Sequence, residues 1–248
     1  MPYIKEICKA GKTIEISKYY SFRWHIKGEK RERAEDESSE AQKRINQRQA
    51  ETKLRRILNT NFRDGDYLLT LDFYKTNLPR GSDEMQELTS KAIRKMRAIL
   101  KRQGLDKEWK YVYVKEVGKR SSRHIHMVMT KTDIEILRKC WPYGGIHLQP
   151  LYSNGQYGQI AAYFIKYAIK TEENEGMLIG KRWYGSRNLK KPIVRKKVIT
   201  ANEFRKEAKD IKGYRVIPDS ISEGVSELTG FEFFSYMMIR TDKEGGGG

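Results

Sequence analysis

The chain has 248 residues, of which 38% are hydrophobic, and its 50 Lys and Arg against 32 Asp and Glu give a formal net charge of +18. This length allows one core with appendages, and no stretch approaches the ~20 apolar residues of a membrane span. The excess of positive charge favours a polyanionic partner, most simply a nucleic acid, over a solvated basic surface or a membrane surface. The first residues lack the apolar segment of a signal peptide, so we expect a cytoplasmic protein.

Residues 1–63 are predicted to form a basic N-terminal arm. Residues 12–26 alternate in hydrophobicity as a short hairpin does. Residues 41–59 favour a helix, with a thin apolar stripe that includes Leu54 and Leu58. We expect this arm to pack weakly, either as an extension ordered by DNA or as a solvated charged helix.

Residues 64–172 read as the main domain. A strand over residues 67–73 precedes a helix that is capped by Ser82 or Asp83 and ends at Gly104. Strands over residues 111–117 and 123–129 follow, then a short helix with a capping box of Thr132 and Glu135, and a strand over residues 145–151. The order β-α-β-β-α-β predicts an α+β fold with a ferredoxin-like, split βαβ antiparallel sheet.

Two of the four histidines, His124 and His126, stand one residue apart in the third of these strands. Alternation along a strand places both on one face, which suits metal ligands, although a pair of hydrogen-bonded core histidines is the alternative. If Val117 pairs with Arg123, then Glu116 faces His124 across the ladder. Two imidazoles and one carboxylate would leave a metal with open positions, as a Lewis-acid centre requires.

A helix is predicted around residues 159–170, with Tyr163, Lys166, Tyr167 and Lys170 at positions i, i+3, i+4 and i+7 of one face. Tyrosines on a half-buried helix commonly only direct their hydroxyls to solvent. Next to a metal site in a basic chain they gain a second interpretation, because a phenol is a competent nucleophile when a cation lowers its pKa.

These motifs resemble those of the HUH endonuclease superfamily, specifically the rolling-circle replication initiators of small phages and plasmids. The resemblance rests on residues 69–73, on Glu116 with the His-Ile-His sequence at 124–126, and on the Tyr-Phe-Ile-Lys-Tyr-Ala-Ile-Lys sequence at 163–170. It covers about residues 67–170, and the repeated Tyr-x-x-Lys is similar to the two-tyrosine phage branch. Asp72 is a departure, since many relatives have Thr or Asn there.

The resemblance implies an enzyme that nicks and joins single-stranded DNA at an origin with a hairpin or nick site. His124, His126 and Glu116 would hold Mg²⁺ or Mn²⁺. Tyr163 or Tyr167 would form a 5′-phosphotyrosine and leave a free 3′-OH, while Lys166 and Lys170 would offset charge on the phosphate or the phenolate. The implied partners are host replication proteins such as a helicase and a polymerase, in the cytoplasm of a bacterial host cell.

Residues 173–248 are predicted to form a basic C-terminal accessory region, which includes a short helix capped by Thr200 and Glu203 and an apolar strand over residues 231–239. Its basic and aromatic side chains suit phosphate contacts and base stacking. With basic residues near the histidine strand, the residues predicted to contact DNA are Lys119, Arg120, Arg123, Lys181, Arg182, Trp183, Arg187, Asn188, Lys190 and Lys191.

Two classes of function stay open from the sequence. The first is the tyrosine-dependent DNA nicking and joining enzyme, in which a relaxase or a tyrosine transposase would share the chemistry. The second is a non-catalytic nucleic-acid-binding regulator that has the same fold and uses its histidines for packing.

Overall fold

The computed structural model describes residues 3–21, 40–118, 122–176, 181–200, 204–227 and 229–241. It confirms a mixed α+β protein with antiparallel sheets. The chain divides into two compact units: unit 1 comprises Met1–Ala50 with Lys191–Gly248, and unit 2 comprises Glu51–Lys190. The boundaries between the units fall after residues 50 and 190, whereas the boundaries expected from the sequence lie after residues 63 and 172. Helix α1 (Glu40–Asn61) begins in unit 1 and ends in unit 2.

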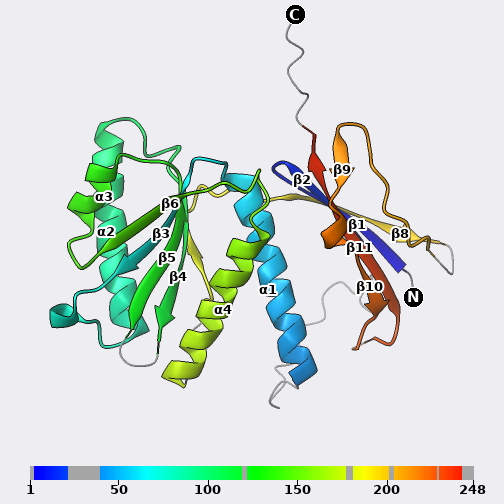
Figure 1. Cartoon of the computed structure of the whole chain (residues 1–248), viewed down its shortest axis with the longest axis horizontal. Coiled ribbons are helices and arrows are strands. Elements are labelled where there is room, and N and C mark those ends of the chain that lie inside the picture. The colour runs from blue at the N-terminus through cyan, green and yellow to red at the C-terminus, as the bar shows by residue number, and fades with distance from the viewer. Residues whose placement is uncertain are drawn as a thin grey trace, which may run out of the picture. The chain divides into compact units, whose positions relative to one another are not determined.

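Unit 2 contains one antiparallel sheet with the strand order β6-β3-β5-β4-β7 (Figure 1). Its strands are β3 (Tyr67–Asp72), β4 (Tyr111–Val117), β5 (Arg123–Met129), β6 (Ile146–Pro150) and β7 (Tyr184–Gly185). Helix α2 (Ser82–Arg102) lies between β3 and β4, after a 3₁₀ turn at Lys75–Asn77, and helix α3 (Ile134–Cys140) lies between β5 and β6. The predicted order of strands and helices is therefore confirmed, and the histidine strand β5 lies in the middle.

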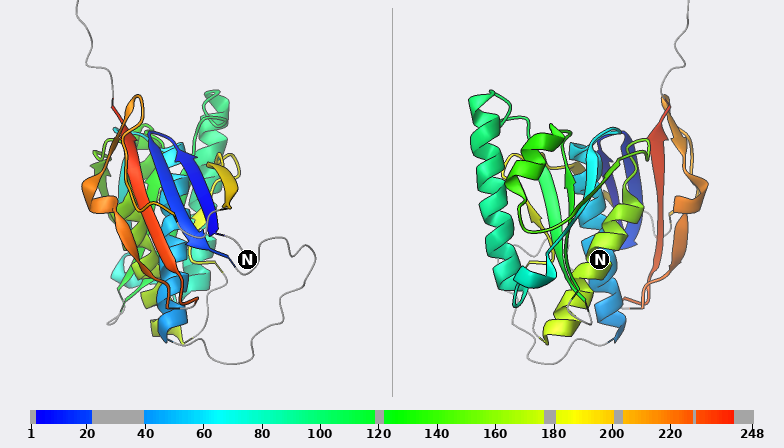
Figure 2. Two further views of the ribbon diagram at one scale, coloured as in Figure 1. Left: turned by 90° about the vertical axis from the view of Figure 1, so that its right-hand side faces the viewer. Right: turned by 60° about the vertical axis from the view of Figure 1, so that its left-hand side comes forward.

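Helices cover both faces of this sheet (Figure 2). On one face, Leu69, Ile125 and Met127 pack with buried residues of α2 and α3. Helix α4 (Gly158–Glu175) packs on the other face, where Phe164 and Ile165 are fully buried. Because β-strand side chains alternate, every second residue of β3, β4 and β5 faces α4, and these include both histidines.

The predicted caps of α2 and α3 were wrong. Gly81 precedes α2 without any side-chain cap, and the backbone N–H of Ser82 donates instead to Glu175 Oε1 at 2.6 Å. The carboxylate that completes this helix start thus comes from the far end of α4, which no local pattern reveals. Helix α3 is capped by Asp133, whose side chain accepts from the Glu135 N–H, and not by Thr132.

Unit 1 contains a six-stranded sheet with the order β10-β11-β2-β1-β8, in which β9 also pairs with β11 (Figure 2). Its strands are β1 (Tyr3–Ala10), β2 (Thr13–Tyr20), β8 (Ile193–Ile199), β9 (Tyr214–Val216), β10 (Ser222–Val225) and β11 (Glu232–Arg240), with a 3₁₀ turn at Pro218–Ser220. The N-terminal hairpin turns near Gly11, whose φ is +58°, so it lies earlier than predicted from residues 12–26. Residues 22–26 of that prediction lie outside the described residues.

Other expectations are partly confirmed. The helix expected at residues 41–59 is α1, but Leu54 and Leu58 are fully buried, so the prediction of weak packing was wrong for them. The late apolar strand is β11, and it lies within the sheet rather than at an edge. Of the helix expected after Thr200, residues 201–203 lie outside the described residues, and 204–210 are not helical.

Cys8 and Cys140 are both buried. Among the described residues, no helix has both the length and the apolar character needed to cross a membrane.

Candidate active site

The strand register places His124 between two carboxylates. Val117 pairs with Arg123 and Glu116 with His124, as predicted, while Asp72 lies opposite His124 on the other side. Residues directly opposite in an antiparallel pair project to the same face. The centre of the sheet face under α4 therefore combines imidazoles and carboxylates.

Asp72 binds two histidines. The Nδ1 atom of His124 donates to Asp72 Oδ1 at 2.7 Å, and Nε2 of His147, from β6, donates to Asp72 Oδ2 at 2.8 Å. The other ring nitrogen of His124 lies 2.7 Å from Ser122 Oγ. A carboxylate on Nδ1 fixes the imidazole orientation and tautomer and leaves Nε2 as the available ligand atom.

His126 is only 3% exposed and has partners at both ring nitrogens. Its Nδ1 lies 3.2 Å from Thr70 Oγ1, and its Nε2 donates to Glu116 Oε2 at 2.8 Å. The second oxygen of Glu116 accepts from Lys170 Nζ at 2.6 Å. Glu116 therefore contacts His126, which lies two residues along β5 from its register partner His124.

The Glu116 carboxyl is an anion stabilised by two donors. Burial alone would raise its pKa, but the hydrogen bonds from His126 and Lys170 outweigh burial and lower the pKa of Glu116. The hydrogen bond to Glu116 in turn raises the pKa of Lys170. Because the folded pKa of Glu116 lies below the unfolded value, its contribution to stability is complete above about pH 4.3 and is lost as the pH falls through the folded pKa.

This sign gives a prediction for acid unfolding. As the pH is lowered from neutral to below about 4.3, the urea midpoint of the parent protein should fall further than that of Glu116→Gln, which has no carboxylate to protonate. The exposed Glu173 on α4 offers a control, since Glu173→Gln should follow the parent. Equal acid sensitivity of all three proteins would show that the Glu116 contacts do not stabilise the fold.

The two predicted tyrosines lie over His126. The ring centroids of Tyr163 and Tyr167 are 5.1 Å and 4.6 Å from that of His126, and 4.4 Å from each other. Tyr163 is 40% exposed. Burial of its hydroxyl, followed by the neighbouring Tyr167, raises the pKa of Tyr163.

The two predicted lysines lie in different environments. Lys170 Nζ is 5.3 Å from the Tyr167 ring centroid and also holds Glu116, so it is part of the site. Lys166 is exposed on the surface of α4. Of the two ammonium groups, only that of Lys170 contacts another predicted site residue among the contacts of the described residues.

A pocket of about 360 Å³ opens beside Tyr163. Besides this tyrosine, it is lined by Leu68, Thr70, His147, Gln149, Gln159 and Ile160. Apolar side chains and amide groups thus surround the exposed phenol. The pocket lies next to the histidine face, since His147 and Thr70 are among its lining residues.

The types of side-chain donor fit a divalent metal ion, although these donors are hydrogen-bonded to other protein groups. The described part of the chain contains no group of three or more His, Cys, Asp or Glu side chains that is arranged to hold a metal ion. However, His126 Nε2 and Glu116 Oε2 already converge at 2.8 Å, and Asp72 orients His124 as metal-binding histidines are oriented. Carboxylate oxygen suits both Mg²⁺ and Mn²⁺, and imidazole nitrogen is a common ligand of divalent transition metals.

The residues predicted to contact DNA fall into three groups. Lys119 and Arg120 lie outside the described residues. Three have structural contacts: Arg123 donates to the Ser122 carbonyl, Arg182 pairs with Glu172 at 3.3 Å, and the Asn188 amide donates to two backbone carbonyls. Trp183 is half-buried, and the exposed members are Lys181, Arg187, Lys190 and Lys191.

Two site residues were not assigned a role from the sequence. Asp72 was recognised only as a departure from the family pattern, and His147 was not singled out. His147 stands in a predicted strand, but its place beside Asp72 depends on β6 pairing with β3, which the sequence pattern does not specify. Had the ferredoxin-like strand order been applied to the histidines, it would have placed His147 at this edge of the site.

Gly144 is needed for the position of Asp72. A Cβ atom at Gly144 would lie 2.1 Å from the Asp72 carbonyl oxygen, a backbone atom. Gly144→Ala should therefore displace the end of β3 and lower the free energy of unfolding by about 1–3 kcal/mol, measured by urea titration.

Gly158→Ala is the matched control, because a Cβ there would meet only side-chain atoms, at 3.2 Å or more. It should leave stability unchanged or raise it slightly. If the two variants were equally stable, the close approach of residues 72 and 144 would not constrain the fold.

Comparison with family models gives one match: residues 66–172 match the model for replication-associated protein ORF2/G2P. This segment contains β3 through almost all of α4, and thus every residue of the site described above. Searches of curated proteins and of solved structures gave no match. The match is consistent with a Rep-type replication initiator.

Proposed function

We propose that unit 2 is a metal-dependent endonuclease and strand transferase that starts rolling-circle replication by nicking single-stranded DNA. The observation that carries this proposal is the packing of two phenols, Tyr163 and Tyr167, against the imidazole of His126, which contacts Glu116. The match of residues 66–172 to a replication-associated family supports DNA replication as the process served.

The topology supports the finer assignment of the fold. The order β6-β3-β5-β4, together with a strand-helix-strand-strand-helix-strand sequence, agrees with a ferredoxin-like sheet. We assign this core to the HUH superfamily, in its two-tyrosine form. The additional helix α4 carries the tyrosines over the histidine strand.

In the proposed reaction, a phenol oxygen attacks the phosphorus atom and the bond from phosphorus to the 3′ oxygen breaks. The phosphate stays on the tyrosine as a 5′-phosphotyrosine, and the departing oxygen takes up a proton to become a 3′-OH. The attacking phenol gives up its proton to water as its oxygen bonds to phosphorus. Attack of a 3′-OH on the phosphotyrosine reverses these steps and rejoins the strand without a nucleotide cofactor.

The residues that would hold Mg²⁺ or Mn²⁺ are His124, His126 and Glu116, and the ion when bound would act as a Lewis acid on the phosphate. Asp72 has a positioning role, since it holds the Nδ1 side of His124. Lys170 holds Glu116, and its ammonium nitrogen lies 5.3 Å from the Tyr167 ring centroid, beside the proposed nucleophiles.

The proposed chemistry defines the partners. The substrate is a single-stranded origin, exposed at a hairpin or nick site. The 3′-OH that nicking releases is the primer end that a host polymerase extends, and a host helicase would expose the strand ahead of it.

The direct test uses a labelled pool of single-stranded oligonucleotides of random sequence with Mn²⁺. The proposal predicts two products: a fragment whose 3′-OH a polymerase extends, and a fragment that migrates with the protein in a denaturing gel. A non-catalytic regulator would instead retard the DNA in a native gel and leave every strand intact, which would contradict the proposal.

A further inference from the structure

The sheet of unit 1 has one face on which positive charges lie together. Strands β1 and β8 are antiparallel neighbours, and β8 forms an edge of the sheet. By the register, one face of this pair carries Tyr3, Lys5, Ile7 and Lys9 from β1 and Ile193, Arg195, Lys197 and Ile199 from β8. We call this the β1–β8 face. It has four basic side chains and no acidic one.

The opposite face of the same two strands is built differently. There Glu6 lies directly opposite Lys196, and the two form an ion pair at 3.0 Å. Opposite charges across a ladder stabilise a sheet, and like charges directly opposite destabilise it. Within the ladder of β1 and β8, a carboxylate is thus opposed to a lysine on this face, whereas Lys5 is opposed to Lys197 on the β1–β8 face.

On the β1–β8 face, like charges lie directly opposite one another at Lys5. Lys5 is opposite Lys197 on one side and opposite Lys18 of β2 on the other, so three lysines form a row across three strands. Burial and then the proximity of Lys5 lower the pKa of Lys18. Its ammonium group donates to the carbonyl of Arg205, while Arg195 and Lys197 stay exposed.

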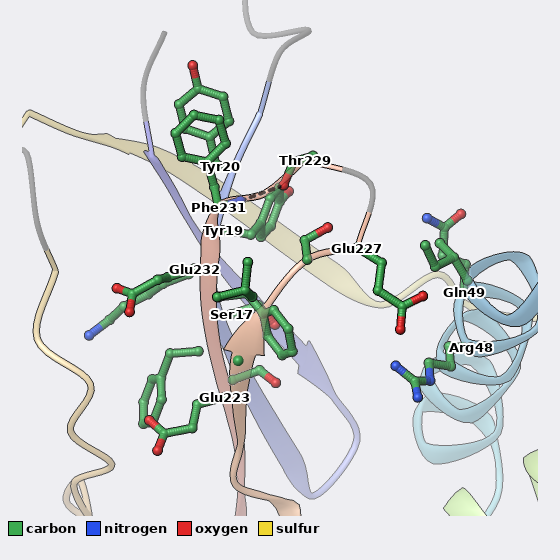
Figure 3. Close-up of a pocket in the computed structure, with 18 of the residues that line it drawn as sticks. Ser17, Tyr19, Tyr20, Arg48, Gln49, Glu223, Glu227, Thr229, Phe231 and Glu232 are labelled. Atoms are coloured by element: carbon green, nitrogen blue, oxygen red, sulfur yellow. Dashed lines mark hydrogen bonds between the residues drawn. The ribbon is translucent and has the colours of Figure 1, made fainter. Parts of the chain in front are cut away.

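Aromatic rings lie at one end of the β1–β8 face. Tyr3 is opposite Tyr20, with ring centroids 5.6 Å apart, and Tyr20 stacks on Phe231 at 3.7 Å (Figure 3). Phe204 adds an edge contact to Tyr3 at 4.9 Å. Half-buried rings beside a row of cations are the combination that binds single-stranded nucleic acids, by base stacking and phosphate contacts.

A neighbouring pocket of unit 1 lacks this charge bias. The pocket drawn in Figure 3 has a volume of about 550 Å³. Its basic lining residues Lys18, Arg44 and Arg48 are matched by the acidic Glu223, Glu227 and Glu232. This pocket therefore offers a polyanion no excess of positive charge.

We propose that the β1–β8 face of unit 1 is a second binding surface for single-stranded nucleic acid, separate in sequence from the tyrosine site of unit 2. Lys5, Lys9, Arg195 and Lys197 bind phosphates, and Tyr3 with Tyr20 offers a stacking platform at one end. Phosphates on the face neutralise the repulsion between the opposed lysines. The proposal does not depend on nicking, because it concerns binding by unit 1.

The test measures binding of fluorescein-labelled oligothymidine by anisotropy, in EDTA so that no divalent metal acts, over a range of salt concentrations. Lys5→Gln/Lys197→Gln should flatten the slope of log affinity against log salt by about 1.4. Each lost phosphate contact accounts for about 0.7 of this change, and the variant loses two such contacts. The same double variant should melt at a higher temperature in low salt, since repulsion is relieved. A gain in stability with a loss of binding excludes misfolding as the cause.

The matched control is Lys196→Gln/Lys209→Gln, which removes two charges from unit 1 at lysines that pair with Glu6 and Glu207. This control should keep the parental slope. Tyr3→Leu should weaken binding about 5-fold or more with little change in slope.

Three results would overturn the proposal. Identical slopes for both double variants would place the strand elsewhere on the chain. Equal competition by a duplex of the same length would rule out a single-strand surface. The third result is that the Lys5→Gln/Lys197→Gln variant only self-associates. In that case the two lysines of the parent protect the edge strand β8 from pairing with other chains and bind no nucleic acid.

Discussion

Replacing both Tyr163 and Tyr167 with phenylalanine is expected to reduce covalent attachment of DNA to the protein to below detection. Both rings keep their packing against His126 in this variant, because only the two hydroxyl oxygens are removed. Folding and DNA binding should be retained, since binding rests on a net charge of +18. The measurement is the fraction of labelled single strand that migrates with the protein in a denaturing gel with Mn²⁺.

The single variants distinguish two mechanisms. If the tyrosines alternate as nucleophiles, Tyr163→Phe and Tyr167→Phe should each retain some adduct, because either phenol lies within 5.1 Å of the His126 ring. If one single variant is inactive and the other normal, one tyrosine is the only nucleophile and its neighbour packs beside it. An adduct in the double variant would contradict the assignment of both.

Replacing His126 with alanine is expected to lower cleavage at least about 100-fold, while binding of single-stranded DNA changes little. Loss of a residue that only supports a metal ligand commonly costs about 10–100-fold, so loss of the proposed ligand itself should cost no less. His126 is also the residue on which both tyrosines and Glu116 converge. Cleavage rates with Mn²⁺ and anisotropy in EDTA measure the two effects separately.

His147 provides the comparison for this prediction, because it is a histidine of the same sheet face that contacts Asp72 and not Glu116. His147→Ala should reduce cleavage less than His126→Ala does. If both variants cut as fast as the parent, the histidines serve packing and the metal site is wrong.

The core of the site could be predicted from the sequence where the information is local. The alternation of residues 123–129 places His124 and His126 on one face, and the short connection after Val117 fixes the pairing of Glu116 with His124. The helical spacing of Tyr163 and Tyr167 likewise fixes their common face. Each of these relations spans fewer than about ten residues, so the chain pattern determines it.

The contacts between side chains of the site could be predicted less well from the sequence. Register specifies which Cβ atoms are opposed, but the Glu116 side chain reaches along the strand to His126, where Lys170 also holds it. Asp72 and His147 meet because β3 lies between β5 and β6, and that order is a property of the whole sheet. A pattern confined to one strand does not contain it.

The organisation of the chain ends could not be predicted for a related reason. Strand β1 pairs with β8, so Tyr3 is opposite Ile199, and β2 pairs with β11. No motif connects such distant segments in a single sequence, and each was therefore interpreted as part of a separate extension. The repeated opposition of lysines on the β1–β8 face became visible only with this pairing.

The central claim is tested most directly by mapping the covalent bond. The parent chain is incubated with Mn²⁺ and the random pool of single strands, digested with nuclease and trypsin, and analysed by mass spectrometry. Cleavage after Lys166 places Tyr163 and Tyr167 on different peptides, so each can be scored separately. The account predicts a nucleotide phosphate on Tyr163, Tyr167 or both, and its absence from both, or its presence only on another residue, would contradict it.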